Sequence, residues 1–190
     1  LKAPIPKVIR GETGFATSQN YQIWFESITP QSASRGVVIL IMGNGNDALT
    51  WPPTFISNLI DLGYQVIRFD HRETGLSTSE EKWKKKNAYS LNDMAGDVIA
   101  VLDTLEVDKA HIVGASMGGM IAQLVAIEFP ERTISLTSIM SSGDVMDPTL
   151  PQMSNDIVGP MIGSILKHGF LGNTKGQIKR QLVQKRILMG

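Results

Sequence analysis

Continuous apolar, β-branched segments recur along the chain, and each predicts a strand of a parallel sheet. A strand without polar alternation is buried on both faces, as strands are in a parallel sheet covered by helices. We therefore expect these segments to form the interior of one sheet. They are residues 36–42, 64–70, 110–114 and 134–140.

A different pattern precedes them. Residues 21–28 carry polar positions among apolar ones, which predicts a half-buried strand. The pair Gln19-Asn20 favours a turn, so we expect this strand to form an antiparallel hairpin with residues 14–18.

The intervening segments have apolar residues at helical spacing. Strands that alternate with helices predict an α/β fold with a mainly parallel sheet. Ser90 and Asp93 form the signature of a capping box at the start of one helix. The predicted helices are 55–62 after the pair Pro52-Pro53, 91–105, and 117–129 before Pro130.

The regular alternation stops at Asp147. Prolines and glycines then divide residues 147–190 into short helical pieces. We therefore expect residues 1–146 to form the α/β part of the chain and residues 147–190 to form a separate, small helical element.

The strongest chemical signal is a G-x-S-x-G motif at residues 114–118, between a predicted strand and a predicted helix. A nucleophile elbow requires this context. The tight turn strains the backbone of Ser116 and lifts its hydroxyl above the sheet, and crowding leaves room only for glycine on either side. The N–H of Met117 points to the same place and can donate to an oxyanion. The alternative is an ordinary glycine-rich turn with an exposed serine.

The turn at residues 42–46 has two interpretations. In the first, the N–H of Asn44 is the second donor of an oxyanion hole. In the second, residues 43–48 are the G-x-G-x-x-A of a dinucleotide-binding oxidoreductase, and Asp70, ~20 residues further on, binds the ribose. The second interpretation needs a helix that opens within the glycines, whereas the proline pair places the helix start beyond them.

The loop at residues 70–77 is expected to be structural. Its acidic, basic and hydroxyl side chains can bond to neighbouring loops, and Gly75 can supply a positive φ. His71 follows the wrong strand to be a catalytic base.

Composition excludes several classes of protein. The 190 residues include 18 Lys+Arg and 18 Asp+Glu, a balance that argues against a nucleic-acid partner. Cysteine is absent, which excludes thiolate catalysis and Cys-ligated zinc. No apolar run approaches the ~20 residues of a membrane span. The expected location is the cytoplasm, while secretion or the periplasm stays open because the chain does not begin with Met.

The chain resembles the α/β-hydrolase superfamily through residues 42–44, 70–77 and 111–120, in this order and spacing. Within it, residues 42–44, Trp51-Pro52 and 70–75 are most similar to the aclacinomycin methylesterase-like hydrolases, bacterial esterases that act on carboxylic methyl esters of polyketides. The resemblance implies an α/β-hydrolase-type sheet with helices on both faces, in which residues 147–190 begin a helical cap. Many members have His-Gly in the oxyanion turn, where this chain has Met42-Gly43.

The resemblance also implies a catalytic triad in the order Ser, acid, His, with the acid and the His in strands after the cap. We therefore expect the acid and the His to be absent from this chain, and residues 1–190 to be inactive alone. The weaker candidates within the chain are His168 as base and Asp144 or Asp147 as acid.

The sequence thus predicts a serine hydrolase of carboxylic esters, with a small apolar or polyketide-like ester as its substrate. Ser116 would form an acyl-enzyme, Asn44 and Met117 would hold the oxyanion, and no metal or cofactor is implied. An Asp nucleophile, as in dehalogenases and epoxide hydrolases, is excluded because position 116 is Ser. A haloperoxidase-like or C–C bond hydrolase uses the same triad and stays open, as do a non-catalytic binding domain and the oligomeric state.

Overall fold

A computed structural model describes residues 10–79 and 89–143, together with 149, 155–156, 159–160 and 163. The chain divides into two compact units, Leu1–Asp144 and Val145–Gly190. Every helix and strand named below belongs to the first unit. The prediction that residues 147–190 begin a helical cap falls mostly outside the described residues and stays a prediction.

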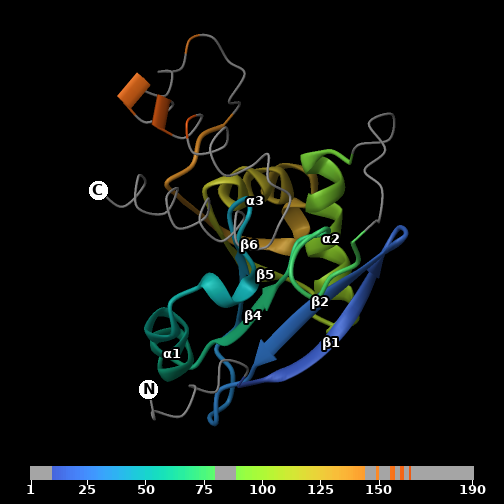
Figure 1. Cartoon of the computed structure of the whole chain (residues 1–190). Coiled ribbons are helices and arrows are strands. Elements are labelled where there is room, and N and C mark those ends of the chain that lie inside the picture. The colour runs from blue at the N-terminus through green and yellow to red at the C-terminus, as the bar shows by residue number, and fades with distance from the viewer. Residues whose placement is uncertain are drawn as a thin grey trace, which may run out of the picture. The chain divides into compact units, whose positions relative to one another are not determined.

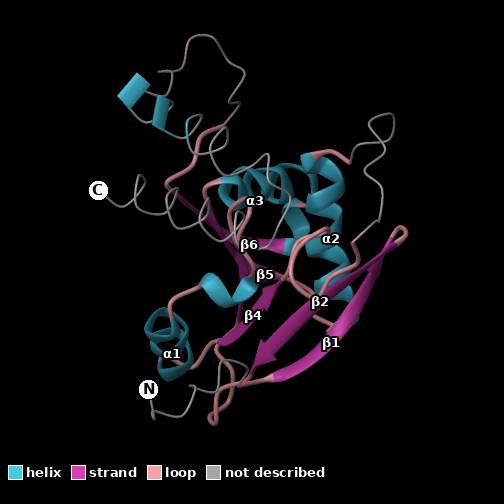
Figure 2. Ribbon diagram, in the orientation of Figure 1, coloured by secondary structure: helices cyan, strands magenta, loops and turns pink. Residues whose placement is uncertain are grey.

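In the described part of the first unit, the strands form one mixed sheet in the order β1-β2-β4-β3-β5-β6 (Figure 2). β3 pairs in parallel with β4 and β5, and β6 pairs in parallel with β5, whereas β1 and β2 are antiparallel to their neighbours. The predicted α/β fold class is therefore confirmed. The strands are β1 Glu12–Ser18, β2 Tyr21–Ile28, β3 Val37–Ile41, β4 Gln65–Phe69, β5 Ala110–Ala115 and β6 Thr133–Ile139.

The predicted N-terminal hairpin is present. Ser18 pairs with Tyr21, so Gln19 and Asn20 form a two-residue turn. Gln19 has a φ of 52°, in the left-handed region that such tight hairpin turns require.

Helices cover both faces of the sheet (Figure 1). α1 (Pro53–Asp61) packs on one face, against a core that includes Leu40 and Val66. α2 (Leu91–Thr104) and α3 (Met117–Glu128) pack on the other face, against a core that includes Ile39 and Ile112. Because alternate residues of β3 enter opposite cores, its continuous apolar sequence is explained. Short 3-10 turns lie at Ala48–Thr50 and Pro130–Arg132.

β6 differs from the expectation that it is buried on both faces. Residues 134–138 are exposed, with Leu136 at 41%. The physical reason is its place in the sheet, because β6 lies at the edge and pairs only with β5 among the described strands. Its alternating Ile-Ser-Leu-Thr sequence is more typical of a half-covered strand than of a central one.

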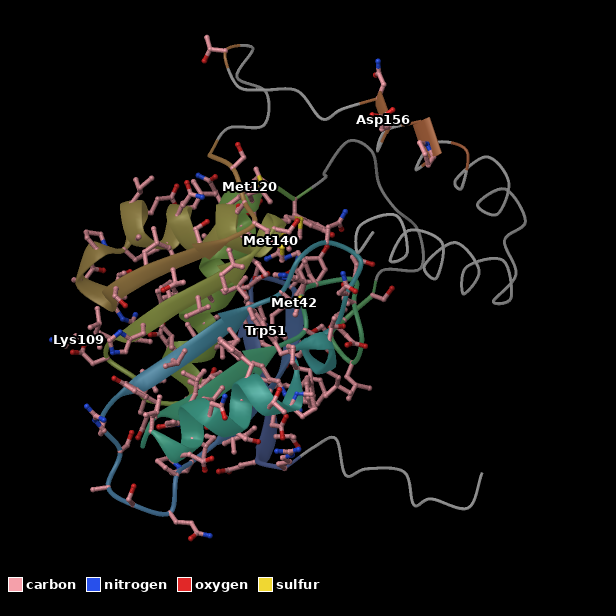
Figure 3. All side chains as sticks on the ribbon, turned by 90° about the vertical axis from the view of Figure 1, so that its left-hand side faces the viewer. Met42, Trp51, Lys109, Met120, Met140 and Asp156 are labelled. Carbon is pink, nitrogen blue, oxygen red and sulfur yellow. The ribbon has the colours of Figure 1, made fainter. Side chains whose placement is uncertain are left out.

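The carboxyl ends of the parallel strands lie at one end of the sheet. Met42 follows β3 and Met140 follows β6, and both lie toward this end, whereas Lys109, which precedes β5, lies at the opposite end (Figure 3). In open α/β sheets, ligands bind outside the carboxyl ends of the strands. A ligand site is therefore expected at this end of the sheet.

Among the described residues, the structure contains no helix that is both long and apolar enough to cross a membrane.

Candidate active site

Ser116 lies in the sharp turn between β5 and α3. Its backbone has φ 54° and ψ −123°, a conformation that an L-amino acid adopts only under constraint. The constraint includes a hydrogen bond in which Ser116 N–H donates to the carbonyl of Ile139, at 2.9 Å. The residue is exposed, and its hydroxyl makes no hydrogen bond to any part of the chain that the structure describes.

The glycines around Ser116 are required by backbone contacts. A Cβ at Gly114 would lie 2.1 Å from the carbonyl oxygen of Gly118, and a Cβ at Gly118 would lie 2.1 Å from the carbonyl oxygen of Ile41. Both distances are far below van der Waals contact, and neither backbone partner can rotate away. The steric prediction for the motif is therefore confirmed.

The turn after β3 lies directly against Ser116. A Cβ at Gly43 would be 3.1 Å from the Cβ of Ser116 and 3.6 Å from its hydroxyl oxygen. Asn44, the next residue, is exposed, and Met117 is the first residue of α3. The N–H groups of the first helical turn have no partner within the helix, so that of Met117 can serve an anion at this place.

Asn44 and Met117 line one small pocket of about 230 Å³. The turn after β3 and the start of α3 contribute one side of its lining. The loop after β4 and the start of α2 contribute the other, including His71, Tyr89 and Met94. Asn44 and Met117, the two residues that the sequence predicts to form an oxyanion hole, thus line the same pocket, and the exposed Ser116 directly precedes Met117.

Asp70 has a structural role in this arrangement. Its carboxylate accepts hydrogen bonds from the N–H of Ala48 at 2.8 Å and of Leu76 at 2.9 Å. Burial raises the pKa of Asp70 above its ordinary value, while the two N–H donors lower it. Gly75 has a φ of 56°, and a Cβ there would lie 2.0 Å from the carboxylate.

The dinucleotide interpretation of residues 43–48 has no support in this geometry. Both carboxylate oxygens of Asp70 are already bound to the backbone, so they are not presented to a ribose. α1 begins at Pro53, beyond the glycines, so no helix N-terminus is available within the turn for a pyrophosphate.

The side chain of His71 is hydrogen-bonded to the turn after β3 and not to Ser116. It is 3% exposed, and its Nε2–H donates to the carbonyl of Met42 at 2.7 Å. Burial lowers the pKa of His71 below its ordinary value, so the ring is neutral at pH 7. The prediction that His71 is structural agrees with these contacts.

The other histidine that the structure describes lies away from Ser116. His111 lies at the start of β5, the opposite end from Ser116, and its Nδ1 is 2.8 Å from the hydroxyl of Ser135. His168, Asp144 and Asp147 lie outside the described residues. No cluster of three His, Cys, Asp or Glu that could hold a metal is found in the part of the chain that the structure describes.

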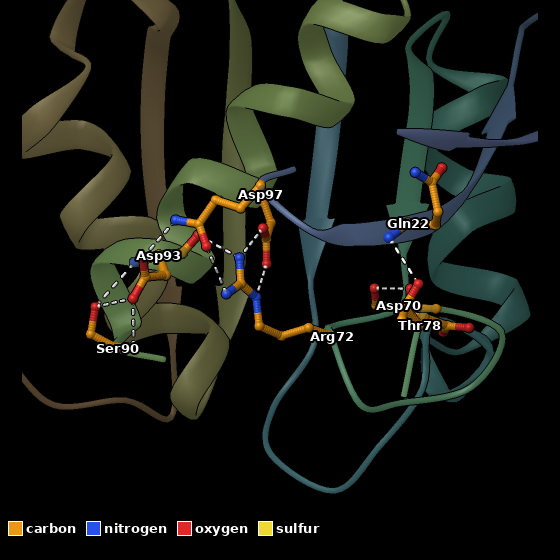
Figure 4. Close-up of polar contacts among 9 residues, drawn as sticks. Gln22, Asp70, Arg72, Thr78, Ser90, Asp93 and Asp97 are labelled. Carbon is orange, nitrogen blue, oxygen red and sulfur yellow. Dashed lines mark hydrogen bonds and ion pairs between the residues drawn. The ribbon is translucent and has the colours of Figure 1, made fainter. Parts of the chain in front are cut away.

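Sequence reasoning missed a buried ion pair that anchors the loop after β4. Arg72 Nε donates to Asp97 of α2 at 2.8 Å, and both side chains are fully buried (Figure 4). The guanidinium also lies over two aromatic rings, 4.3 Å from the centroid of Tyr21 and 5.1 Å from that of Tyr89. The only sequence signal was a charged residue, Asp97, on the apolar face of a predicted helix.

A second buried pair was also missed. Glu26 of β2 and Arg68 of β4 are cross-strand partners, and Arg68 Nε donates to Glu26 at 2.6 Å. Glu26 also accepts the N–H of Gly11 at 2.8 Å. The pair joins two adjacent strands of the sheet. In the sequence, Glu26 is a polar position of the predicted half-buried strand 21–28, and Arg68 lies within a segment predicted to be buried on both faces.

Comparison with known proteins agrees with this architecture. The sequence pattern of the alpha/beta hydrolase fold matches residues 36–161. The rhodomycin D methylesterase DnrP of Streptomyces peucetius is 36% identical over 129 residues, which are 67% of this chain and 42% of that protein. The rhodomycin D methylesterase DauP of Streptomyces sp. (strain C5) is 37% identical over the same number of residues and the same shares of each chain.

Solved structures share the fold. Epoxide hydrolase A from Mycobacterium thermoresistibile superposes with a TM-score of 0.59 at 22% identity, over 68% of this chain and 39% of that one. The chain spans 42% of the length of the methylesterases that it matches. Because the family pattern covers more than half of the chain, including β3 to β6 and the strained turn at Ser116, the chain belongs to the alpha/beta hydrolase fold family.

Proposed function

We propose that the protein is a serine hydrolase that acts on carboxylic esters, with Ser116 as its nucleophile. The observation that carries the proposal is the exposed serine in a strained strand-to-helix turn, packed against Gly43 of the preceding loop. A strained backbone persists only where the surrounding structure holds it, and such residues cluster at functional sites. The similarity to two methylesterases supports an ester as the substrate.

In the proposed mechanism, Ser116 Oγ attacks the ester carbonyl, and its proton passes to a base. The tetrahedral intermediate places its oxyanion between the N–H groups of Asn44 and Met117. Collapse of the intermediate breaks the C–O bond and releases the alcohol, which takes the proton from the base. Water then attacks the acyl-enzyme by the same route and releases the acid.

The pocket indicates the kind of substrate. About 230 Å³ is small, and Met94, Met117 and Tyr89 supply much of its apolar wall. A small acyl or alcohol group fits this volume, and a larger body would extend beyond it. A small apolar or polyketide-like ester therefore remains the proposed substrate.

We propose that the catalytic acid and His come from a part of the whole protein outside residues 1–190. Two observations support this. The two histidines that the structure describes are bound to Met42 and Ser135 and do not reach Ser116. The methylesterases are more than twice as long as the segment that matches this chain.

The test uses the complete protein and a fluorophosphonate probe, which reacts only with an activated serine. We expect covalent labelling of Ser116, shown by peptide mass mapping, and its loss in Ser116→Ala. The matched control is Ser57→Ala in α1, remote from the pocket, which should label like the unmodified protein. Labelling that survives in Ser116→Ala would exclude Ser116 as the nucleophile. No labelling of the complete protein would favour a non-catalytic domain.

A further inference from the structure

The buried ring of His71 holds one end of the turn that carries Asn44. Its Nε2 lies 2.7 Å from the carbonyl oxygen of Met42, the residue before Gly43-Asn44. A carbonyl oxygen only accepts, so Nε2 carries the hydrogen and the ring is the Nε2–H tautomer. Nδ1 is buried and has no hydrogen-bond partner among the described residues.

The same carbonyl is confined from the side of the elbow. A Cβ at Gly118 would lie 2.6 Å from the oxygen of Met42, so α3 begins in direct contact with this group. The carbonyl of Met42 thus lies between the imidazole of His71 and the backbone of Gly118. Its direction is set by one hydrogen bond and one close contact.

Gly43 cannot hold this turn by itself. Glycine has no Cβ and adopts many backbone conformations at little cost, and a larger residue is disfavoured here because its Cβ would lie 3.1 Å from that of Ser116. The peptide plane between Met42 and Gly43 is rigid, so the direction of the Met42 carbonyl fixes where the following residues start. The direction of the Asn44 N–H therefore depends on what holds that carbonyl.

We propose that His71 is a positioning residue for the oxyanion site, whose Nε2–H fixes the Met42–Gly43 peptide and thereby aims the N–H of Asn44 at the developing oxyanion. This inference rests on the proposed serine hydrolase function. His71 lines the pocket, but its Nε2–H is bound to Met42, so in this proposal it acts through the backbone of the turn and not on the reacting atoms.

The ring itself is held firmly enough for this role. Its neighbours in sequence are anchored, Asp70 to the N–H groups of Ala48 and Leu76 and Arg72 to Asp97. The ring also makes an edge-to-face contact with Phe69, with centroids 5.4 Å apart. A donor on so constrained a support is preorganised, which is what an oxyanion site requires.

Two substitutions with amide side chains of different length distinguish the role of Nε2 of His71 from that of Nδ1. In His71→Gln, the side-chain nitrogen is as many bonds from the backbone as Nε2, so it can still donate to Met42. In His71→Asn, the amide ends at the level of Nδ1, so the donor to Met42 is lost. Both variants are neutral and polar, which makes each the control for the other.

In the complete protein, we expect His71→Asn to lower kcat for p-nitrophenyl acetate roughly 10- to 100-fold, because small displacements of catalytic groups cost up to about that much. KM should stay within about twofold, and His71→Gln should restore most of kcat. The affinity of a trifluoromethyl ketone, which forms a tetrahedral adduct with the serine, should fall in parallel with kcat. A structural role alone would lower the amount of folded protein in both variants without this selective loss.

The outcomes distinguish the two proposals. If the unmodified complete protein neither turns over esters nor reacts with the fluorophosphonate, the proposed function fails. If it does both and His71→Asn keeps kcat and the ketone affinity, the positioning role of His71 is overturned.

A measurement on the unmodified protein keeps the inference testable if His71→Asn does not fold. Long-range proton–nitrogen NMR correlations of labelled histidine rings distinguish the tautomers, and the ring that is missing in His71→Gln is His71. We expect the neutral Nε2–H tautomer at pH 7. The neutral Nδ1–H tautomer would contradict the hydrogen bond on which the proposal depends, because Nε2 would then carry no hydrogen to donate.

Discussion

The glycines around Ser116 show how one hydrogen atom in place of a methyl group sets the geometry of the site. Gly118 lies where β3, its following turn and α3 meet, and its Cα faces the carbonyls of Ile41 and Met42. A Cβ at Gly96, in the middle of α2, would instead point into open space, with no other described element within 4 Å. The two positions therefore predict opposite responses to the same substitution.

We expect Gly118→Ala to lower the free energy of unfolding by at least about 2 kcal/mol, because the new Cβ meets backbone atoms that cannot repack. Gly96→Ala should raise it by about 0.5–1 kcal/mol, because alanine loses less backbone entropy in a helix. Urea unfolding followed by circular dichroism measures both. Equal effects of the two substitutions would contradict the contacts at Gly118.

The start of α2 depends on a capping box. Ser90 accepts the N–H of Asp93, and the Asp93 carboxylate accepts the N–H of Ser90 at 2.8 Å. The N–H of Ser90, the side-chain amide of Gln19 and the hydroxyl of Ser90 all donate to this carboxylate and lower the pKa of Asp93 from 3.8 to about 2. We expect Ser90→Ala to cost about 1 kcal/mol of unfolding free energy, as is typical for the loss of an N-cap.

The Asp93 carboxylate also predicts a pH dependence. Because its pKa is lower in the folded protein, its contribution to stability is present above about pH 3.8 and is lost as the pH falls toward about 2. The difference in unfolding free energy between the unmodified protein and Asp93→Asn should be constant from pH 5 to 7 and should shrink below pH 4. A difference that grew on acidification would show that the sign of the pKa shift is wrong.

α2 carries two aspartates in ion pairs of different burial, which makes a matched comparison possible. Asp97 pairs with Arg72 and both are fully buried, whereas Asp103 pairs with Arg132 and its side chain is 60% exposed. We expect Asp97→Ala to cost about 3–5 kcal/mol, because it leaves a buried guanidinium without its partner. Asp103→Ala should cost less than about 1 kcal/mol.

Thermal or urea unfolding of the two variants tests this prediction. Asp97→Leu combined with Arg72→Met should cost less than Asp97→Ala alone, because no unpaired charge remains buried. If Asp97→Ala and Asp103→Ala were equally mild, the Arg72 pair would not be what anchors the loop after β4 to α2.

Activity of residues 1–190 depends on whether this chain contains a general base that can deprotonate Ser116. We expect residues 1–190 alone to lack efficient esterase activity, since the described histidines are bound elsewhere and an unactivated serine hydroxyl is a weak nucleophile at neutral pH. Loss of a triad member leaves only ~10³–10⁴-fold catalysis over water. The measurement is p-nitrophenyl acetate hydrolysis by purified 1–190, beside the complete protein and His168→Ala of 1–190. Rapid turnover by 1–190 that disappears in His168→Ala would show that the chain contains its own base.

The positions of the elements were predictable from the sequence because their causes are local. The apolar run at 36–42 and the capping residues Ser90 and Asp93 identify a strand and a helix start from neighbours alone, and the structure confirms both. Gly114 was predictable for the same reason, because its Cβ would meet the backbone of Gly118 within the same turn. The steric demand at Gly118 instead comes from the carbonyls of Ile41 and Met42, which are remote in sequence.

Only the tertiary structure decided which elements meet. The strand order places β6 at an edge and so exposes Leu136, whereas the sequence predicts a strand buried on both faces at residues 134–140. Arg72 and Asp97 are remote in sequence, and the position of Asp97 on the apolar face of its helix does not identify Arg72 as its partner. The bond from His71 to Met42 joins loops that follow two different strands, so it exists only because β3 and β4 are neighbours in the sheet. Sequence neighbours determine where strands, helices and turns form. Burial, charge pairing and the orientation of the turn beside Ser116 depend on contacts between residues that only the folded sheet brings together.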